Sequence, residues 1–189
     1  ELFTARRHRI DHFELPTQDQ VERALRLGLS LAAQPGFTWL DDKFVSCYRR
    51  QLSPTQYARQ IPLRRIAEAG GMIVGSSDCP AGPLSPWLQM QGMVQYPLPA
   101  ERLSMYQALR TYTWNAAWST GEEGARGSLA LGKRADFIVM EEDPFALPVT
   151  EIHRAAVRET WIGGRKARPM NLSAAGLLGK ALLGPRRKI

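Results

Sequence analysis

The chain has 189 residues, a length suited to one ordinary domain or to one domain with a small appendage. Its composition, 44% hydrophobic and 23% charged, is that of a globular protein and excludes an intrinsically disordered one. The net charge is +7, but the basic residues are scattered and form no stripe interleaved with aromatics, so we expect no nucleic-acid role. No apolar run reaches the roughly 20 residues that a membrane span needs.

The first part of the chain predicts a strand, a helix and a second strand. Residues 6–13 alternate enough to form a short strand. An apolar stripe at helical spacing then runs from Thr17, which is placed to cap a helix, to about Gly28, which is placed to end it. Leu29–Gln34 is the second predicted strand, and the Pro-Gly pair that follows stops it.

The next part adds a helix and a third strand. The segment 37–61 is predicted to be irregular or partly helical, and Pro62–Ala69 is a predicted helix with a proline near its first turn. Met72–Val74 is a short strand that is apolar on both faces, as expected in a parallel sheet covered by helices. The order strand, helix, strand, helix, strand therefore predicts an α/β fold with a parallel sheet or a (β/α) barrel.

After a Gly/Pro-rich loop the sequence changes character. Leu103 to about Thr120 is predicted as a single helix, because its apolar residues recur at helical spacing. Ala135–Met140 and Ala155–Ile162 are predicted strands, and Gly163-Gly164 is a predicted hairpin turn into residues 165–168. We therefore expect a small separate sheet packed beside the α/β unit.

Two polar residues fall at the carboxyl ends of predicted parallel strands, where α/β proteins bind ligands: His12 after the first strand and Asp78 after the third. An imidazole and a carboxylate are suitable zinc ligands, and an Asp beside a metal can take up and return the proton of an attacking water. Taken alone, such residues are more commonly structural, as a strand-end His bonded to a backbone carbonyl and as a loop Asp.

Other candidates carry weaker signals. Trp87 follows the Asp78 loop and Gln34 follows the second strand, so both are candidate substrate contacts. Core packing for the tryptophan and a simple strand stop for the glutamine are the plainer interpretations. Cys79 lies beside Asp78, but no activated-thiol context indicates a nucleophile.

Four ordered segments resemble the C-terminal third of the amidohydrolase superfamily, in the branch that includes N-substituted formamide deformylases and exoenzyme regulatory proteins. These segments are Arg9–His12, Gly75–Pro80, Tyr112–Ala117 and Gly127–Met140. The last is the most specific, and together they cover roughly residues 6–168. The resemblance implies a metal-dependent hydrolase fold, a (β/α)8 TIM-like barrel with a small β-sandwich built from both chain ends.

The resemblance places His12 after the sixth barrel strand and Asp78 after the eighth. It implies that both residues bind a divalent metal (zinc first, as one or two ions) and that Asp78 handles the proton of the attacking water. The implied substrate is a small molecule with an amide or another C–N bond. Two departures from the family pattern are conservative: Asp11 replaces the usual Glu before the histidine, and Ser76-Ser77 contains an extra serine before Asp78.

The other metal ligands of the family are absent, namely the first-strand His-x-His pair, the fourth-strand carboxylate or carboxylated lysine and the fifth-strand histidine. The chain has only three histidines. His8 lies more than about 10 Å down an extended strand from His12, and His153 falls in the presumed sandwich region. A catalytic zinc normally has three protein ligands, so we expect this chain alone to bind metal weakly.

We therefore expect an incomplete C-terminal fragment of an amidohydrolase-type enzyme. Residues 1–122 form the last portion of the barrel with its closing helix, residues 123–168 a portion of the β-sandwich, and residues 169–189 a peripheral basic tail. The alternative is a non-catalytic truncated domain that acts through association with itself or with a missing N-terminal half, since three strands cannot close a barrel and leave open edges.

The remaining features concern processing and compartment. The chain opens at Glu1 rather than Met, which indicates an excised fragment or a processed product. Cys47 and Cys79 form no disulfide framework and no signal-peptide pattern opens the chain. Both observations favour a reducing, cytoplasmic location.

Overall fold

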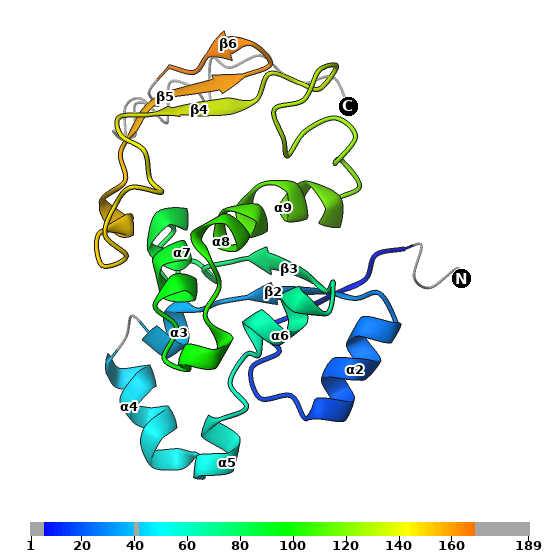
Figure 1. Cartoon of the computed structure of the whole chain (residues 1–189), viewed down its shortest axis with the longest axis vertical. Helices are drawn as coiled ribbons and strands as arrows, with labels where there is room; N and C mark the ends of the chain where they lie inside the picture. The colour runs from blue at the N-terminus through cyan, green and yellow to red at the C-terminus, as the bar shows by residue number, and fades with distance from the viewer. Residues whose placement is uncertain (1–5, 40–41, 169–189) are drawn as a thin grey trace, which may run out of the picture.

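The chain forms an α/β unit with a small antiparallel sheet lying over two of its helices (Figure 1). The computed structural model describes residues 6–39 and 42–168, and the expected basic tail at 169–189 lies outside the described residues. No helix in the described part of the chain is long and apolar enough to cross a membrane.

A three-stranded parallel sheet forms the centre of the α/β unit, in the order β1-β2-β3. Its strands are β1 (Arg9–Asp11), β2 (Ser30–Ala33) and β3 (Met72–Gly75). Asp11 pairs with Ala32, and Ala33 pairs with Gly75, so the carboxyl ends of all three strands meet at one edge. The predicted parallel α/β arrangement is therefore confirmed.

Helix α2 (Gln18–Arg26) connects the first two strands and follows its sequence signals. Thr17 is the N-cap, and its hydroxyl and the side chain of Gln20 form a capping box with each other's backbone N–H. Val21 and Ala24 are buried on the inner side of the helix. Gly28 takes the left-handed conformation that ends the helix (φ 63°), as predicted.

The segment 37–61 contains more helix than its sequence indicates. Its helices are α3 (Gly36–Trp39), α4 (Asp42–Gln51) and α5 (Pro54–Tyr57). Ser53 and Gln56 form a capping box at the start of α5, with proline in the first turn. Helix α6 (Leu63–Glu68) then leads into β3, as predicted.

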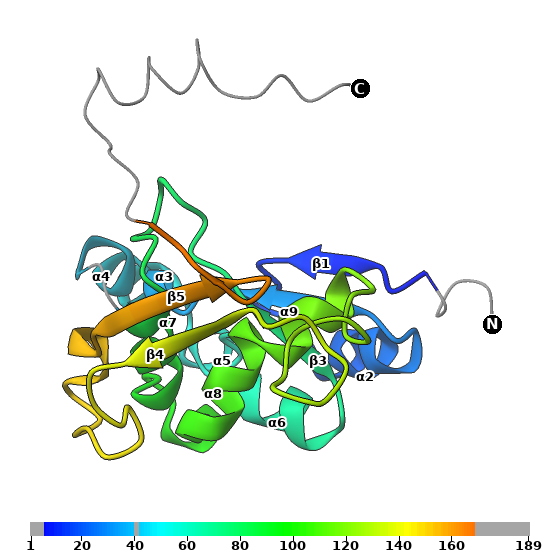
Figure 2. The same cartoon turned by 90° about the horizontal axis from the view of Figure 1, so that it is seen from above.

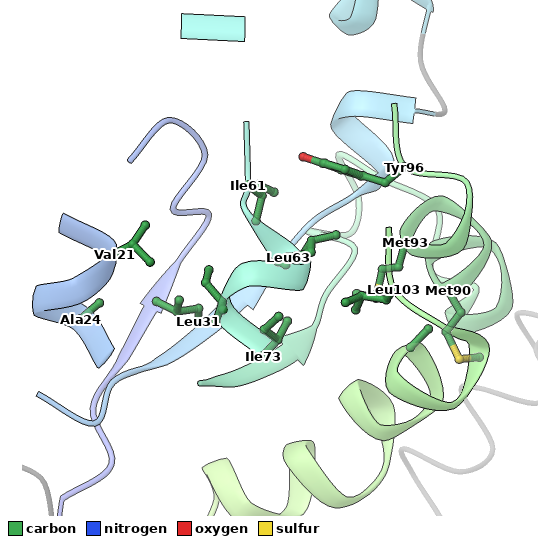
Figure 3. Packing of buried hydrophobic residues seen from close by; sticks show 13 residues of the cluster. Val21, Ala24, Leu31, Ile61, Leu63, Ile73, Met90, Met93, Tyr96 and Leu103 are labelled. Carbon is green, nitrogen blue, oxygen red and sulfur yellow. The ribbon is translucent and has the colours of Figure 1, made fainter. Parts of the chain in front are cut away.

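The core lies between the parallel sheet and the helices around it (Figure 3). Val21 of α2, Leu31 of β2, Leu63 of α6, Ile73 of β3 and Met93 of α7 (Pro86–Val94) belong to one buried cluster. Burial of an aliphatic side chain of this size stabilises the folded state by about 1.5–3 kcal/mol. This cluster fixes the positions of the strands whose ends carry the candidate site.

The single helix predicted for 103–120 is wrong, because the chain breaks at Thr113. Two helices replace it, α8 (Met105–Tyr112) and α9 (Trp114–Ser119). Thr113 has φ −120° and ψ −94°, and its hydroxyl donates to the Leu109 carbonyl at 2.9 Å. The break lets Asn115 donate to the Ile73 carbonyl of β3 at 2.8 Å, a tertiary contact that helical periodicity does not reveal.

The second sheet is antiparallel and lies over α8 and α9 in both views (Figures 1 and 2). Its strands are β4 (Phe137–Met140), β5 (Val157–Ile162) and β6 (Arg165–Lys166). Outside the sheet, the remaining described elements are the 3-10 helices η1 (Pro99–Glu101) and η2 (Ile152–Arg154). Phe137 stacks on Trp161 across β4 and β5, with ring centroids 5.6 Å apart. The predicted sheet is confirmed, although β4 and β5 each begin two residues later than expected.

Candidate functional site

The carboxyl edge of the parallel sheet gathers three of the predicted site residues. His12 directly follows β1, Gln34 directly follows β2, and Asp78 lies three residues after β3. The His12 N–H donates to the Ala32 carbonyl at 3.0 Å, which carries the strand pairing up to the histidine. Ligands of parallel α/β proteins bind at this edge, so the site lies where the fold predicts it.

His12 and Asp78 face each other across this edge. Their nearest side-chain atoms, Nε2 of His12 and Oδ2 of Asp78, are 3.7 Å apart, and both side chains are almost half exposed. This separation is too long for a hydrogen bond. Two ligands of one tetrahedral zinc, each at about 2.0–2.2 Å from the ion, lie roughly 3.4 Å apart, so the pair fits two positions around a single divalent ion.

Three neighbours that sequence reasoning missed restrain the His12 ring. The Nδ1 atom of His12 lies 3.3 Å from Oε1 of Glu14, and the other carboxylate oxygen of Glu14 accepts a hydrogen bond from the Tyr48 hydroxyl at 2.5 Å. Phe37 of α3 stacks on the imidazole with centroids 5.9 Å apart and an interplanar angle of 11°. Glu14 could have been predicted as a neighbour of His12, because it follows the strand-end histidine by two residues. Tyr48 and Phe37 are brought near His12 only by the tertiary structure.

The backbone at the site is held in an uncommon conformation. His12, Phe13 and Asp78 have φ values of 72°, 52° and 53°, which lie in the left-handed region. A residue other than glycine that adopts this conformation lowers the stability of the fold by about 1 kcal/mol or more. Residues of this kind cluster at functional sites. These three residues lie at the carboxyl end of β1 and in the loop after β3, where the His12 and Asp78 side chains face each other.

Gln34 and Trp87, the two predicted substrate contacts, lie in different places. Gln34 is buried at the same edge as His12, and its Oε1 has no hydrogen-bond partner among the described residues. Trp87, on α7, lines a hollow of about 840 Å³ under the antiparallel sheet, and none of His12, Gln34 and Asp78 lines that hollow. A substrate role for either residue remains a prediction.

The other candidate donors do not join the site. The His153 Nδ1 lies 2.8 Å from Oε1 of Gln91, and Cys79 is an exposed free thiol. The described residues contain no group of three or more His, Cys, Asp or Glu side chains that could hold a metal ion. The described part of the chain therefore contributes two metal ligands at most to the candidate site.

The most specific sequence segment, 127–140, has a structural role. The Lys133 ammonium donates to the Glu123 carbonyl at 2.5 Å and to the Ser128 hydroxyl at 2.8 Å, which closes the loop between α9 and β4. Asp136 accepts a hydrogen bond from the Gly163 N–H at 2.6 Å and so holds the β5–β6 turn. These side chains hold the loop and the turn that flank the antiparallel sheet, and none of them is a candidate residue of the site at His12 and Asp78.

Several known hydrolases are similar to this chain. It is 29% identical over 163 residues to N-substituted formamide deformylase of Arthrobacter pascens, an alignment that covers 82% of this chain and 30% of that enzyme. Its fold is similar to that of an uncharacterized metal-dependent hydrolase from Pyrococcus furiosus, with a TM-score of 0.65 and 29% identity over 72% of this chain and 28% of the other. A zinc-bound adenosine deaminase from Xanthomonas campestris shares the fold, with a TM-score of 0.66 and 18% identity over 94% of this chain and 42% of the other.

The chain spans about a third of the length of the curated relatives it matches, for example 30% of the Arthrobacter pascens deformylase and 32% of a putative amidohydrolase of Bacillus subtilis. The sequence profile of the amidohydrolase family matches residues 2–167. Because this match covers most of the 189 residues, the chain belongs to the amidohydrolase family.

Proposed function

We propose that this chain forms the C-terminal part of a metal-dependent hydrolase that acts on an amide or another C–N bond of a small molecule. The observation that carries the proposal is the 3.7 Å separation of His12 Nε2 and Asp78 Oδ2 at the carboxyl edge of the sheet. The Arthrobacter pascens relative, named as a deformylase of N-substituted formamides, supports the class of bond. The zinc of the adenosine deaminase supports zinc as the first candidate metal. We propose one or two ions in the complete fold.

His12 Nε2 and Asp78 Oδ2 are the atoms that would hold the metal. When bound, a divalent ion supplies Lewis-acid activation of water and of the scissile carbonyl. Asp78 is almost half exposed and keeps carboxylate oxygens free of hydrogen bonds from other side chains among the described residues, so it can accept the proton of the water and return it to the leaving nitrogen. His12 is held in place by Glu14 and Phe37, which limits the reorientation needed on binding.

The same proposal assigns the rest of the active site to a segment outside this chain. Within the described residues β1 and β3 are edge strands of a three-stranded sheet, whereas a TIM-like barrel needs eight. We assign residues 1–122 to the sixth to eighth barrel strands with the closing helix, and residues 123–168 to part of a β-sandwich. The alignment with 30% of the deformylase supports a preceding segment that supplies the other strands and ligands.

A second candidate function is a non-catalytic domain that works through association with itself or with a partner chain. It is favoured by the limit of two candidate ligands in the described residues and by the apolar side chains exposed on the antiparallel sheet. Ile138 and Ile162 are about half exposed, and both line the hollow between this sheet and α8. Exposed apolar surface of this kind is typical of interfaces.

Zinc binding distinguishes the two functions. We expect the purified chain to bind zinc weakly and below one ion per chain, and to lose this binding in a His12→Ala, Asp78→Ala double variant, as measured by zinc titration and metal analysis. A His153→Ala, Asp19→Ala variant, which removes the same residue types elsewhere, should bind as the wild type does. Zinc binding that survives in the His12, Asp78 variant contradicts the site, and tight stoichiometric binding contradicts the expected incompleteness.

A further inference from the structure

We infer that Glu14 and Tyr48 are positioning residues that hold His12 as its Nδ1–H tautomer, with the Nε2 lone pair directed at Asp78. The inference rests on the proposed function, because it assigns Nε2 of His12 as the metal-binding atom. Neither residue belongs to the motifs that identify the family in this sequence. Their contacts with the histidine are the basis of the inference.

The Glu14 carboxylate uses both of its oxygens. Oε1 lies 3.3 Å from Nδ1 of His12, and Oε2 accepts the Tyr48 hydroxyl at 2.5 Å. The Glu14 side chain is three-quarters buried, with 24% of its surface exposed, whereas the imidazole is 44% exposed. The carboxylate is therefore enclosed between two partners on its inner side, while the ring edge that carries Nε2 stays open toward Asp78.

This arrangement selects one tautomer of the neutral ring. An ionised carboxylate only accepts hydrogen bonds, so the nitrogen that faces Glu14 must carry the proton. The opposite nitrogen, Nε2, is 3.7 Å from Oδ2 of Asp78, beyond hydrogen-bond distance, and keeps its lone pair. In metal sites the second nitrogen of a ligating histidine almost always donates to a carboxylate or carbonyl, and Nδ1 of His12 faces the Glu14 carboxylate in this way.

Tyr48 fixes the carboxylate from a distant part of the chain. It lies on α4, 34 residues after Glu14, and donates its hydroxyl proton to the carboxylate. Burial and this hydrogen bond raise the pKa of Tyr48, so the phenol stays a donor across the working pH range. Phe37 on α3 stacks against the ring, so the segment between β2 and α6 restrains both the plane and the tautomer of His12.

Nitrogen chemical shifts of the imidazoles test the tautomer directly. Long-range proton–nitrogen NMR spectra of the full 189-residue chain contain signals from only three histidines, and a His12→Gln variant assigns the relevant one. At a pH where the ring is neutral, we expect the Nδ1–H pattern in the wild type and a shift toward the Nε2–H tautomer in Glu14→Ala. Glu14→Gln keeps an acceptor oxygen and should restore most of the wild-type pattern, and Tyr48→Phe should lie between wild type and Glu14→Ala.

The chain offers a matched control. His153 also faces an acceptor through Nδ1, the side-chain oxygen of Gln91 at 2.8 Å. Gln91→Leu should move only the His153 signals, and Glu14→Ala only those of His12. An unchanged His12 tautomer in Glu14→Ala overturns the inference, and the Glu14→Gln and Tyr48→Phe spectra decide the question if the alanine variant fails to fold.

Zinc affinity separates this inference from the proposed function. Loss of Glu14 should weaken zinc binding by about 10–100-fold, the usual effect of removing a partner of a metal-binding histidine. A shifted tautomer with unchanged zinc affinity overturns the positioning role. Absence of zinc binding at His12 in every variant overturns the proposed function, and the tautomer spectra still decide whether Glu14 and Tyr48 hold the ring.

Discussion

Asp78 combines a side chain that we propose as a metal ligand with a costly backbone conformation. Its φ of 53° lies in the left-handed region, which aspartate tolerates better than most residues because its short side chain bonds locally. Its side chain is almost half exposed and contributes little packing. The backbone conformation of Asp78 therefore lowers the stability of the fold while it places a carboxylate opposite His12.

Glycine and alanine at position 78 should differ in stability although both remove the carboxylate. We expect Asp78→Gly to be about 1 kcal/mol more stable to unfolding than Asp78→Ala, because only glycine adopts positive φ without strain. Urea denaturation measures the difference. The same pair of substitutions at Asp11, within β1, should show alanine at least as stable as glycine. Equal stabilities of the two variants at position 78 would contradict a strained backbone there.

The end of β3 is packed directly against α8. A Cβ atom on Gly75 would lie 2.1 Å from a ring carbon of Tyr112, so this glycine is required for close approach of strand and helix. The Tyr112 hydroxyl is buried without a hydrogen-bond partner among the described residues, so the contact with Gly75 is made by the ring. This contact fixes the point from which the loop to Asp78 departs.

A double-mutant cycle tests the contact between these two elements. We expect Gly75→Ala to destabilise the protein by about 1–3 kcal/mol, the usual cost of overpacking. The cost should remain in a Tyr112→Phe background, which keeps the ring, and should shrink in a Tyr112→Leu background, which removes it. Thermal or urea unfolding of the six proteins measures the coupling, and an equal cost of Gly75→Ala in all three backgrounds would exclude the ring as its cause.

At the scale of the whole molecule, one ion pair joins the start of the parallel sheet to the connection with the second sheet. Arg7, just before β1, forms two hydrogen bonds at 2.7 Å with the carboxylate of Glu123, which follows α9. The guanidinium also donates to the Trp118 carbonyl at 2.7 Å and lies 4.6 Å from the centroid of the Trp118 ring. Segments 116 residues apart are therefore held together.

The pH dependence of unfolding should report this pair. The hydrogen bonds from Arg7, together with the Glu123 backbone N–H, lower the pKa of Glu123 from its ordinary value of 4.5 to about 2. A depressed pKa gives stability that is fully present above pH 4.5 and is lost as the pH falls toward 2. Glu123→Gln should therefore lower the melting temperature at pH 7, and the difference from the wild type should narrow between pH 4.5 and 2.

The neighbouring Glu122 provides the control for this measurement. It forms an ion pair with Arg126, four residues further along the chain, and is more exposed than Glu123. We expect Glu122→Gln to change the melting temperature little at any pH, as is usual for ion pairs on the surface. A constant difference between Glu123→Gln and the wild type from pH 7 to pH 2 would contradict the assigned cause.

The sequence by itself determined the order of the three parallel strands with helices α2 and α6 between them, the two longer strands of the second sheet, and the placement of His12 and Asp78 at strand ends. These features depend on local signals, such as the Thr17 cap, the Gly28 terminator and the apolar strand 72–74, whose physics acts within a few residues. The family resemblance added the expected metal chemistry, which spacing alone does not supply.

The tertiary structure decided the features that depend on residues distant in the chain. The helix breaks at Thr113, and Asn115 just after the break donates to the Ile73 carbonyl of β3. The restraint of His12 needs Tyr48 from α4 and Phe37 from α3. Trp87 follows the Asp78 loop in sequence but lines the hollow under the other sheet. Hydrophobic periodicity and motifs report neighbours along the chain, whereas side-chain orientation and partners are set by packing, so only the fold reveals them.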